Sequence, residues 1–157
     1  MTTRDKNPTL RRLDALVGEW RVRIDTGGHS MDGGRAVFTW LAGDGILHQW
    51  ADAEIDDSWP PEWVAGSPLP TSIAIGLDDR TQAFYYVYSD ARGVCRVYRM
   101  SLADGVWKIW GQSGPGFHQR FEGRFSDDGD TIEAYWDHSP DGAAWERDFD
   151  LTYTKVT

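Results

Sequence analysis

Residues 83–112 read AFYYVYSDARGVCRVYRMSLADGVWKIWGQ, and the predicted fold is built around these residues. Three runs rich in aromatic and β-branched residues are separated by the turns ARG and ADG, each of which ends in glycine. A three-residue loop with glycine last is typical of a type I turn followed by a left-handed residue. The stretch therefore predicts three antiparallel strands, with Asp90 opposite Val94 and Leu102 opposite Val106.

In this register one face of the three strands is aromatic but carries polar tips. A packed core favours aliphatic side chains, because a buried hydroxyl or guanidinium group needs a hydrogen-bond partner. We therefore interpret this face as the wall of a pocket. Its members are Phe84, Tyr86, Tyr88, Arg96, Tyr98, Met100, Trp110 and Gln112.

Length and charge narrow the class of protein. The 157 residues suit one domain spanning residues 1–157, and a net charge of -9 argues against nucleic-acid or anionic-membrane partners. A single cysteine, Cys95, excludes an internal disulfide. The start MTTRDKNP has no apolar signal core and no apolar run is long enough to span a membrane, so we expect a cytoplasmic protein.

The N-terminal region predicts a helix over about residues 8–17 that caps one end of a barrel. Asn7 is a good N-cap, Pro8 suits the first helical position, and leucines follow at helical spacing. A strand follows over 19–25, with Trp20 on its inward face, and the glycine-rich residues 26–34 read as a flexible connection.

The next two predicted strands, 35–41 and 46–54, are joined by the turn AGDG. If Ala42 opposes Ile46, two cross-strand pairs form on one face. The pairs are Trp40 with His48 and Phe38 with Trp50. This register predicts that all four side chains point into the pocket.

The segment of about residues 55–71 breaks the alternation. It contains four prolines and two tryptophans, Trp59 and Trp63. Long loops in compact domains are usually functional or disordered. Two interpretations stay open here: a lid over the cavity mouth, or a loop whose tryptophans pack on the barrel rim.

Further strands are predicted over 72–77, 117–125, 131–139 and 145–156. A four-residue loop over 127–130 pairs Phe121 with Trp136, whereas a three-residue loop pairs His118 with His138 and buries Arg120. The first register buries apolar groups, so we prefer it. It predicts three polar side chains inside the barrel, namely Gln119, His138 and Arg147.

Ten alternating strands joined mostly by tight turns favour an all-β fold, an antiparallel up-and-down barrel with a short N-terminal helix. Closure removes unpaired strand edges, and a barrel of this size is too wide for side chains to fill. The sequence thus predicts a cavity for a small molecule, and nine tryptophans suit its wall.

Six segments carry a family resemblance. They are LVGEW, IAIGLDDRT, SDARGVCRVYRMSL, DGVWKIW, FHQRFEGRFSDDGDTIEA and WERDFDLTYTKV. The chain resembles uncharacterised bacterial lipocalin-like domains of the calycin superfamily, and is distantly similar to fatty-acid-binding proteins and nitrobindins. The resemblance implies a small-molecule carrier. Similarity to the nitrobindins implies that His138 is the candidate ligand for haem; we otherwise expect no cofactor.

Two function classes follow from the predicted pocket. The first is binding of a hydrophobic, aromatic or polycyclic molecule. The second is a cofactor-free cyclase, isomerase or proton-transfer enzyme, with His48 or His138 as acid/base and Arg96 stabilising an oxyanion. The predicted ligand-binding residues are Phe38, Trp40, Trp50, Tyr86, Tyr88, Tyr98, Trp110, Gln119, Trp136 and Arg147.

Each of these polar residues also has a plainer interpretation. The histidines suit hydrogen bonds in a wet cavity, and Arg96 and Arg147 suit either a ligand carboxylate or internal ion pairs. No metal-binding, phosphate-loop or GxSxG motif occurs. An exposed patch of Tyr85, Arg99, Trp107 and Tyr135 would suit a dimer face, so both a monomer and a homodimer stay open.

Overall fold

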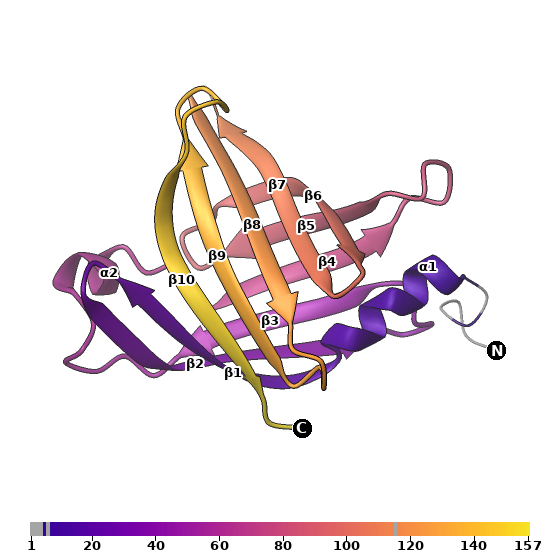
Figure 1. The fold of residues 1–157 in the computed structure, drawn as a ribbon, viewed down its shortest axis with the longest axis horizontal. Coiled ribbons are helices and arrows are strands. Elements are labelled where there is room, and N and C mark those ends of the chain that lie inside the picture. Colours follow the sequence, from indigo (N-terminus) through magenta and orange to yellow (C-terminus); the bar gives the residue numbers. More distant parts are fainter. Residues whose placement is uncertain (1–4, 6, 115) are drawn as a thin grey trace.

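The structure is a computed structural model that describes residues 5, 7–114 and 116–157; the side chains of Gln112 and Ser113 lie outside this description. Ten antiparallel strands form a closed barrel (Figure 1). The elements are α1 (Pro8–Arg11), the 3-10 helix η2 (Arg12–Leu16), β1 (Gly18–Thr26), β2 (His29–Trp40), β3 (Leu47–Ala53), α2 (Pro61–Ala65), β4 (Thr71–Leu77), β5 (Phe84–Asp90), β6 (Cys95–Ala103), β7 (Val106–Gly114), β8 (Phe117–Phe125), β9 (Thr131–Ser139) and β10 (Glu146–Lys155).

Each strand pairs with its neighbours in the chain, and β1 also pairs with β10. This closure gives every strand a paired neighbour on both sides, which is the physical advantage of a barrel over an open sheet. The predicted all-β fold, an up-and-down barrel with one short N-terminal helix, is confirmed. No helix in the described part of the chain combines the length and the apolar character needed to span a membrane.

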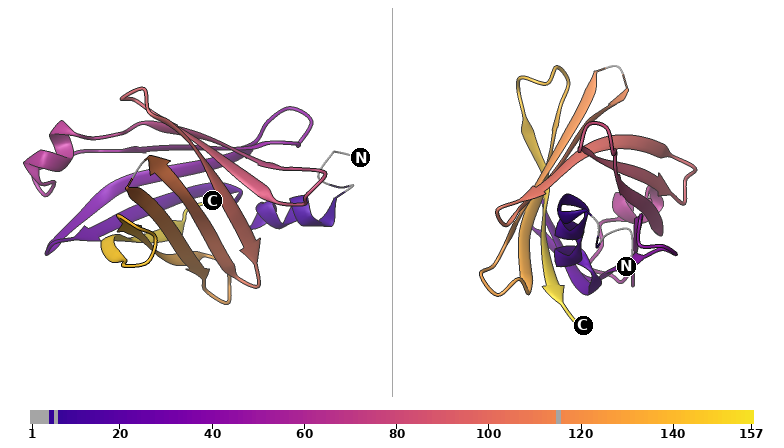
Figure 2. Two further views of the ribbon diagram at one scale, coloured as in Figure 1. Left: turned by 90° about the horizontal axis from the view of Figure 1, so that it is seen from above. Right: turned by 90° about the vertical axis from the view of Figure 1, so that its right-hand side faces the viewer.

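The N-terminal helix closes one end of the barrel, and α2 lies at the opposite end (Figures 1 and 2). The Asn7 side chain caps α1 by accepting hydrogen bonds from the backbone N–H groups of Thr9 and Leu10, at 3.0 and 3.3 Å. Its leucines are buried, and the Trp20 indole N–H donates to the carbonyl oxygen of Leu16 at 2.8 Å. The helix is thereby anchored to β1.

The half of the barrel next to α1 is filled by interlocking side chains. The Trp107 ring meets Phe121 at 4.7 Å and Phe38 at 6.1 Å between centroids, both edge to face. Such pairs are preferred over face-to-face stacks because of the quadrupole of each ring. Other side chains buried in this core include Trp20, Leu47, Ile75, Ile109 and Ile132.

The connection predicted over residues 26–34 is instead a tight hairpin. Gly27 and Gly28 have φ values of 53° and 81°, and β2 begins directly after them at His29. Two successive residues with positive φ form the two-residue turn whose twist matches the flanking strands, and glycine adopts it without steric cost. The predicted flexible segment is therefore wrong, because this dipeptide suffices to reverse the chain.

The two turns of the central stretch have different outcomes. After β5 the predicted register is confirmed: the Asp90 N–H donates to the Val94 carbonyl at 3.1 Å. After β6 the turn contains two residues rather than three, because Asp104 also adopts a positive φ, and Ala103 pairs with Val106. This shift by one residue turns every side chain of β7 to the opposite face.

The preferred register between β8 and β9 is confirmed, since Phe125 pairs with Ile132 and Phe121 pairs with Trp136. Residues 54–70, which connect β3 to β4 and contain α2, are called the cover segment below. The Ala91 N–H donates to the carbonyl oxygen of Pro68 at 2.9 Å. This bond ties the cover segment to the turn between β5 and β6.

Candidate functional site

The half of the barrel next to α2 contains a cavity of about 550 Å³. Its wall combines inward-facing residues of the barrel with four residues of the cover segment, namely Trp59, Trp63, Pro68 and Leu69. A volume of this size lies within the range of small-molecule sites. A second hollow, lined wholly by residues 55–65, shares only Trp59 with the described wall of the cavity.

Six residues predicted for the pocket do line this cavity. They come from β5, β6, β8 and β9, where the predicted side-chain alternation is correct. These residues are Tyr86, Tyr88, Arg96, Tyr98, Gln119 and Trp136.

Phe38 and Trp40 lie on the inner face of β2 but belong to the packed half. Phe38 is fully buried against Trp107, and the Trp40 indole N–H donates to the Asp14 carboxylate of η2 at 2.9 Å. Their predicted place in the ligand pocket is wrong, because they lie beside the helix that closes the opposite end of the barrel.

His48 and Trp50 are on the outer face of β3, so their predicted inward orientation is wrong. Leu41, not Ala42, bonds to Ile46 across the turn, which shifts the register by one residue and pairs Phe38 with Gln49. The imidazole of His48 lies 2.7 Å from the Ser72 hydroxyl on the outside of the barrel. Gln49, which sequence reasoning missed, points inward instead.

Trp110 also faces outward, and 43% of its surface is exposed. The two-residue turn before β7 explains this, since it places Trp107 and Ile109 inside the barrel instead. Trp107 was predicted for an exposed patch and is instead 1% exposed. Both predictions are wrong for the same reason, namely the length of one turn.

Arg147 lies outside the barrel, contrary to its predicted place in the pocket. A bulge between Arg147 and Phe149 interrupts the alternation of β10. The guanidinium group bonds to the carboxylates of Asp137 at 2.9 Å and Asp150 at 2.5 Å, and packs over the Tyr135 ring. The bulge turns Asp148 into the cavity wall, and no sequence signal marks it.

His138 follows Trp136 on the inner face of β9, as predicted, but it is not among the residues that line the cavity. Its ring stacks on Phe117 at 6.3 Å. A haem bound inside the cavity would need an imidazole nitrogen directed at its iron. Haem binding through His138 therefore stays a prediction that this geometry does not support.

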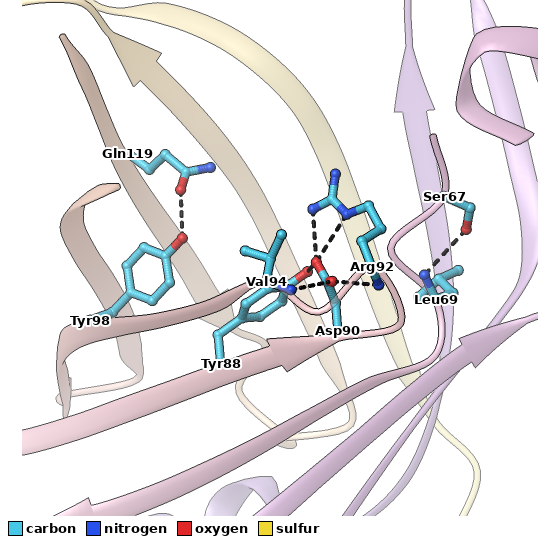
Figure 3. Close-up of polar contacts among 8 residues, drawn as sticks. All are labelled: Ser67, Leu69, Tyr88, Asp90, Arg92, Val94, Tyr98 and Gln119. Atoms are coloured by element: carbon cyan, nitrogen blue, oxygen red, sulfur yellow. Dashed lines mark hydrogen bonds and ion pairs between the residues drawn. The ribbon is translucent and has the colours of Figure 1, made fainter. Parts of the chain in front are cut away.

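Glutamine side chains satisfy two tyrosine hydroxyls inside the cavity. The Tyr86 hydroxyl donates to Gln49 Oε1 at 3.2 Å, and the Tyr98 hydroxyl donates to Gln119 Oε1 at 2.5 Å (Figure 3). Burial raises the pKa of Tyr86 well above its ordinary value. The Tyr86 hydroxyl therefore stays protonated at neutral pH and acts as a hydrogen-bond donor, not as a base.

A second polar cluster lies at the turn between β5 and β6 (Figure 3). The Asp90 carboxylate accepts hydrogen bonds from the Tyr88 hydroxyl at 2.8 Å and from Arg92 at 2.8 and 3.1 Å. Burial alone would raise the pKa of Asp90, but these bonds outweigh it and lower the pKa to about 2. The cluster is thus a closed ion pair of zero net charge.

The cover segment places aromatic rings over the cavity. Trp63 meets Phe149 edge to face at 5.4 Å, and Trp59 is only 6% exposed. The Trp59 indole N–H is buried and has no hydrogen-bond partner among the described residues. Within the cover segment the Leu69 N–H also donates to the Ser67 hydroxyl at 3.2 Å (Figure 3).

Asp148 is the carboxyl group that the bulge in β10 turns inward. Burial raises the pKa of this group, and the nearby His138 opposes the shift. Within the described ranges, no group of three or more His, Cys, Asp and Glu side chains is placed to hold a metal ion. The described wall therefore offers aromatic surface and hydrogen-bonding groups to a bound molecule.

Comparison with known proteins supports the fold alone. No family model and no curated protein matches the chain. A solved structure with the same architecture is the crystal structure of Rv2717c from M. tuberculosis, with a TM-score of 0.59 and 16% sequence identity. The match covers 96% of this chain and 98% of that chain.

Proposed function

We propose that this protein binds a hydrophobic small molecule, aromatic or polycyclic, in the barrel cavity. The observation that supports this most directly is the cavity of about 550 Å³ enclosed by aromatic side chains of the barrel and of the cover segment. Cavities of this kind bury most of a small ligand, and a few polar groups fix its orientation.

The arrangement of the rings favours an aromatic ligand. Tyr98 meets Trp136, Tyr86 and Tyr88 at centroid distances between 6.0 and 6.5 Å, with steep angles between the planes. These rings already contact one another, so a flat ligand would pack against the surfaces that they turn to the cavity, which adds to the free energy gained by removing apolar surface from water.

The cover segment supports the same proposal. Trp59 and Trp63 lie over the cavity, and the bond between Ala91 and Pro68 fixes one end of the segment to the barrel. A ligand covered in this way loses contact with water on the side of the cover segment as well, so more of its apolar surface contributes to affinity. A calycin-type carrier role, which the sequence resemblance implies, is part of this proposal.

The enzyme alternative has less support from the site. His48 lies outside the barrel, and His138 is not part of the described cavity wall. Burial raises the pKa of both Tyr86 and Tyr153, so neither phenol acts as a base at neutral pH. Arg96 is the predicted catalytic residue that does line the cavity, and an arginine alone supplies no acid/base pair.

The proposal is tested on freshly purified protein by mass spectrometry under native and denaturing conditions, with an absorption spectrum of the same sample. We expect an excess native mass that disappears on denaturation and corresponds to one hydrophobic molecule per chain. A Soret band that His138→Ala removes would support haem instead. An empty chain that also binds no naphthalene derivative would contradict the proposal.

A further inference from the structure

We infer that the ligand is an aromatic acid whose anionic group is held by Arg96 and Gln49. This inference rests on the proposed function, because it assigns a chemical class to the molecule in the same cavity. It is carried by the distribution of unpartnered hydrogen-bond donors over the cavity wall.

Arg96 differs from the other arginines of the cavity wall. Arg92 is paired with Asp90, and Arg35 is paired with Glu19. The half-buried Arg96 has neither a hydrogen bond nor an ion pair among the described residues. A desolvated guanidinium group without a counter-ion is unfavourable, and a bound carboxylate would supply two parallel hydrogen bonds.

Gln49 supplies a second unpartnered donor. The residue is 5% exposed, and its side-chain oxygen accepts the hydrogen bond from Tyr86. Its amide nitrogen has no acceptor among the described residues, and it is not one of the fully buried side-chain atoms. A buried amide gains free energy when a ligand oxygen accepts from it.

The two donors lie in one row of the barrel wall. Gln49 of β3 pairs with Ile73 of β4, Ile73 pairs with Tyr88 of β5, and Tyr88 pairs with Arg96 of β6. Side chains that are paired directly across strands share one face of a sheet. The row therefore presents two donors to the cavity, with Ile73 and Tyr88 between them.

Tyr88, the polar residue between Gln49 and Arg96 in this row, does not neutralise Arg96. The Tyr88 hydroxyl donates to Asp90, whose two oxygens already accept from Arg92 and from the backbone N–H groups of Arg92 and Val94. Asp90 thus has its own counter-ion and its lone pairs are occupied. Asp52 of β3 also lines the cavity; among the described lining residues from β4 to β6, Arg96 carries the charge that has no counter-ion.

The opposite wall sets the orientation of the ligand. Asp148 of β10 lines the cavity and has no side-chain hydrogen bond among the described residues. An anion beside this carboxylate would be repelled, so the acidic group belongs at Arg96 and the ring belongs near Trp136 and Phe149. The two walls together favour an anionic group at one end of a flat apolar body.

The test uses three naphthalenes that share one ring system and differ in charge. Isothermal titration calorimetry measures the binding of 2-naphthoate, of neutral 2-naphthamide and of cationic 2-(aminomethyl)naphthalene to the full chain. We expect the naphthoate to bind the unmodified protein about tenfold more tightly than the amide, since hydrogen bonds to charged groups exceed neutral ones. The amine should bind most weakly.

Arg96→Gln should lower the affinity for naphthoate by roughly tenfold or more and change the affinity for naphthamide by less than about twofold. The matched control is Arg99→Gln on the same strand, because Arg99 is exposed and stacks on the Tyr85 ring outside the barrel. This control should leave the binding of all three probes unchanged.

A second pair of variants tests the geometry of the two walls. Gln49→Leu should weaken naphthoate by about three- to tenfold through the loss of a neutral hydrogen bond. Asp148→Asn should strengthen naphthoate by about two- to threefold, since it removes a like charge from a partly solvated site. Circular dichroism establishes that each variant is folded.

Two results would overturn the inference and leave the proposed function intact. One is an Arg96→Gln variant that binds naphthoate as well as the unmodified protein does, or that loses both probes equally. The other is tightest binding of the amine, which would show that Asp148 dominates recognition. If none of the three probes binds and the purified chain also carries no small molecule, the proposed function and this inference fail together.

Discussion

The two halves of the barrel use the same kinds of residue for different ends. Next to α1 the rings of Trp107, Phe121 and Phe38 fill the interior, whereas next to α2 the rings of Tyr98 and Trp136 surround a cavity. The difference lies in the polar tips. Around the cavity, hydrogen bonds between tyrosines and glutamines hold the side chains in place. The rings therefore leave the space between the walls open.

If the cavity binds the proposed ligand, stability and binding are separable along the barrel axis. The packed half provides tight packing around a buried core, and removal of its side chains opens voids. The cavity half already contains a void, so truncation there should affect binding of the proposed ligand more than stability.

The largest effect is expected for Trp107→Ala. Trp107 is fully buried among aromatic rings, so its truncation should lower the free energy of unfolding by about 3–5 kcal/mol. Trp136→Ala in the cavity half should lower it by roughly 1–2 kcal/mol, because part of that ring already faces the cavity. Urea unfolding followed by circular dichroism measures both values, and equal losses would remove the distinction between the halves.

A pair of indole N–H groups sharpens the comparison. Trp20→Phe deletes a buried hydrogen bond to Leu16 and should cost about 1–3 kcal/mol of unfolding free energy. Trp59→Phe removes a similar ring volume but deletes an N–H that has no partner among the described residues, so it should cost about 1 kcal/mol less than Trp20→Phe. Urea unfolding measures the loss in unfolding free energy for both variants. A greater loss at Trp59 than at Trp20 would contradict the hydrogen-bond assignment.

The acid dependence of stability should depend on Asp90. Its pKa is lowered to about 2 in the folded protein, against an ordinary value near 3.9 in the unfolded chain. The contribution of Asp90 is therefore fully present above about pH 4 and is lost as the pH falls through about 2. Asp90→Asn should flatten the decline of the unfolding free energy between pH 4 and 2, relative to the unmodified protein. An unchanged slope would contradict the ion pair with Arg92.

The smallest effect is expected for Arg147→Gln on the outer face. Asp137 keeps its second arginine, since Arg120 also bonds to it at 3.1 Å. The exposed arginine should therefore contribute about 1 kcal/mol or less to the free energy of unfolding, and naphthalene binding should be unchanged. A loss of binding in this variant would show that the bulge does not turn Arg147 away from the cavity in solution.

Much of the barrel could be predicted from the sequence, because alternation and glycine-containing turns mark strands directly. The register after β5 is predicted correctly from its three-residue turn, and the register after β8 from the one pairing that buries the apolar side chains. The predicted length of the turn before β7 is wrong because Asp104 adopts a left-handed conformation. The letters ADG fit a two-residue turn as well as a three-residue loop.

The candidate site was predicted only in part for the same physical reason. A shift by one residue exchanges the faces of a whole strand, so one turn length decided His48 and another decided Trp110. Gln49 and Asp148 reach the cavity through a register shift and a bulge. Neither feature has a signature in a single sequence, and both depend on how neighbouring strands pair.

The claim that the ligand binds in the cavity is tested most directly by a substitution that fills the cavity and leaves the packed half unchanged. Ala51 lines the cavity, and Ala51→Phe would place a ring in the space assigned to the ligand. Calorimetric titration of 2-naphthoate should give one site per chain and a negative heat-capacity change in the unmodified protein, and no binding in a folded Ala51→Phe variant. Binding that persists unchanged in this variant would contradict the account, because the ligand would then occupy some place other than the hollow half of the barrel.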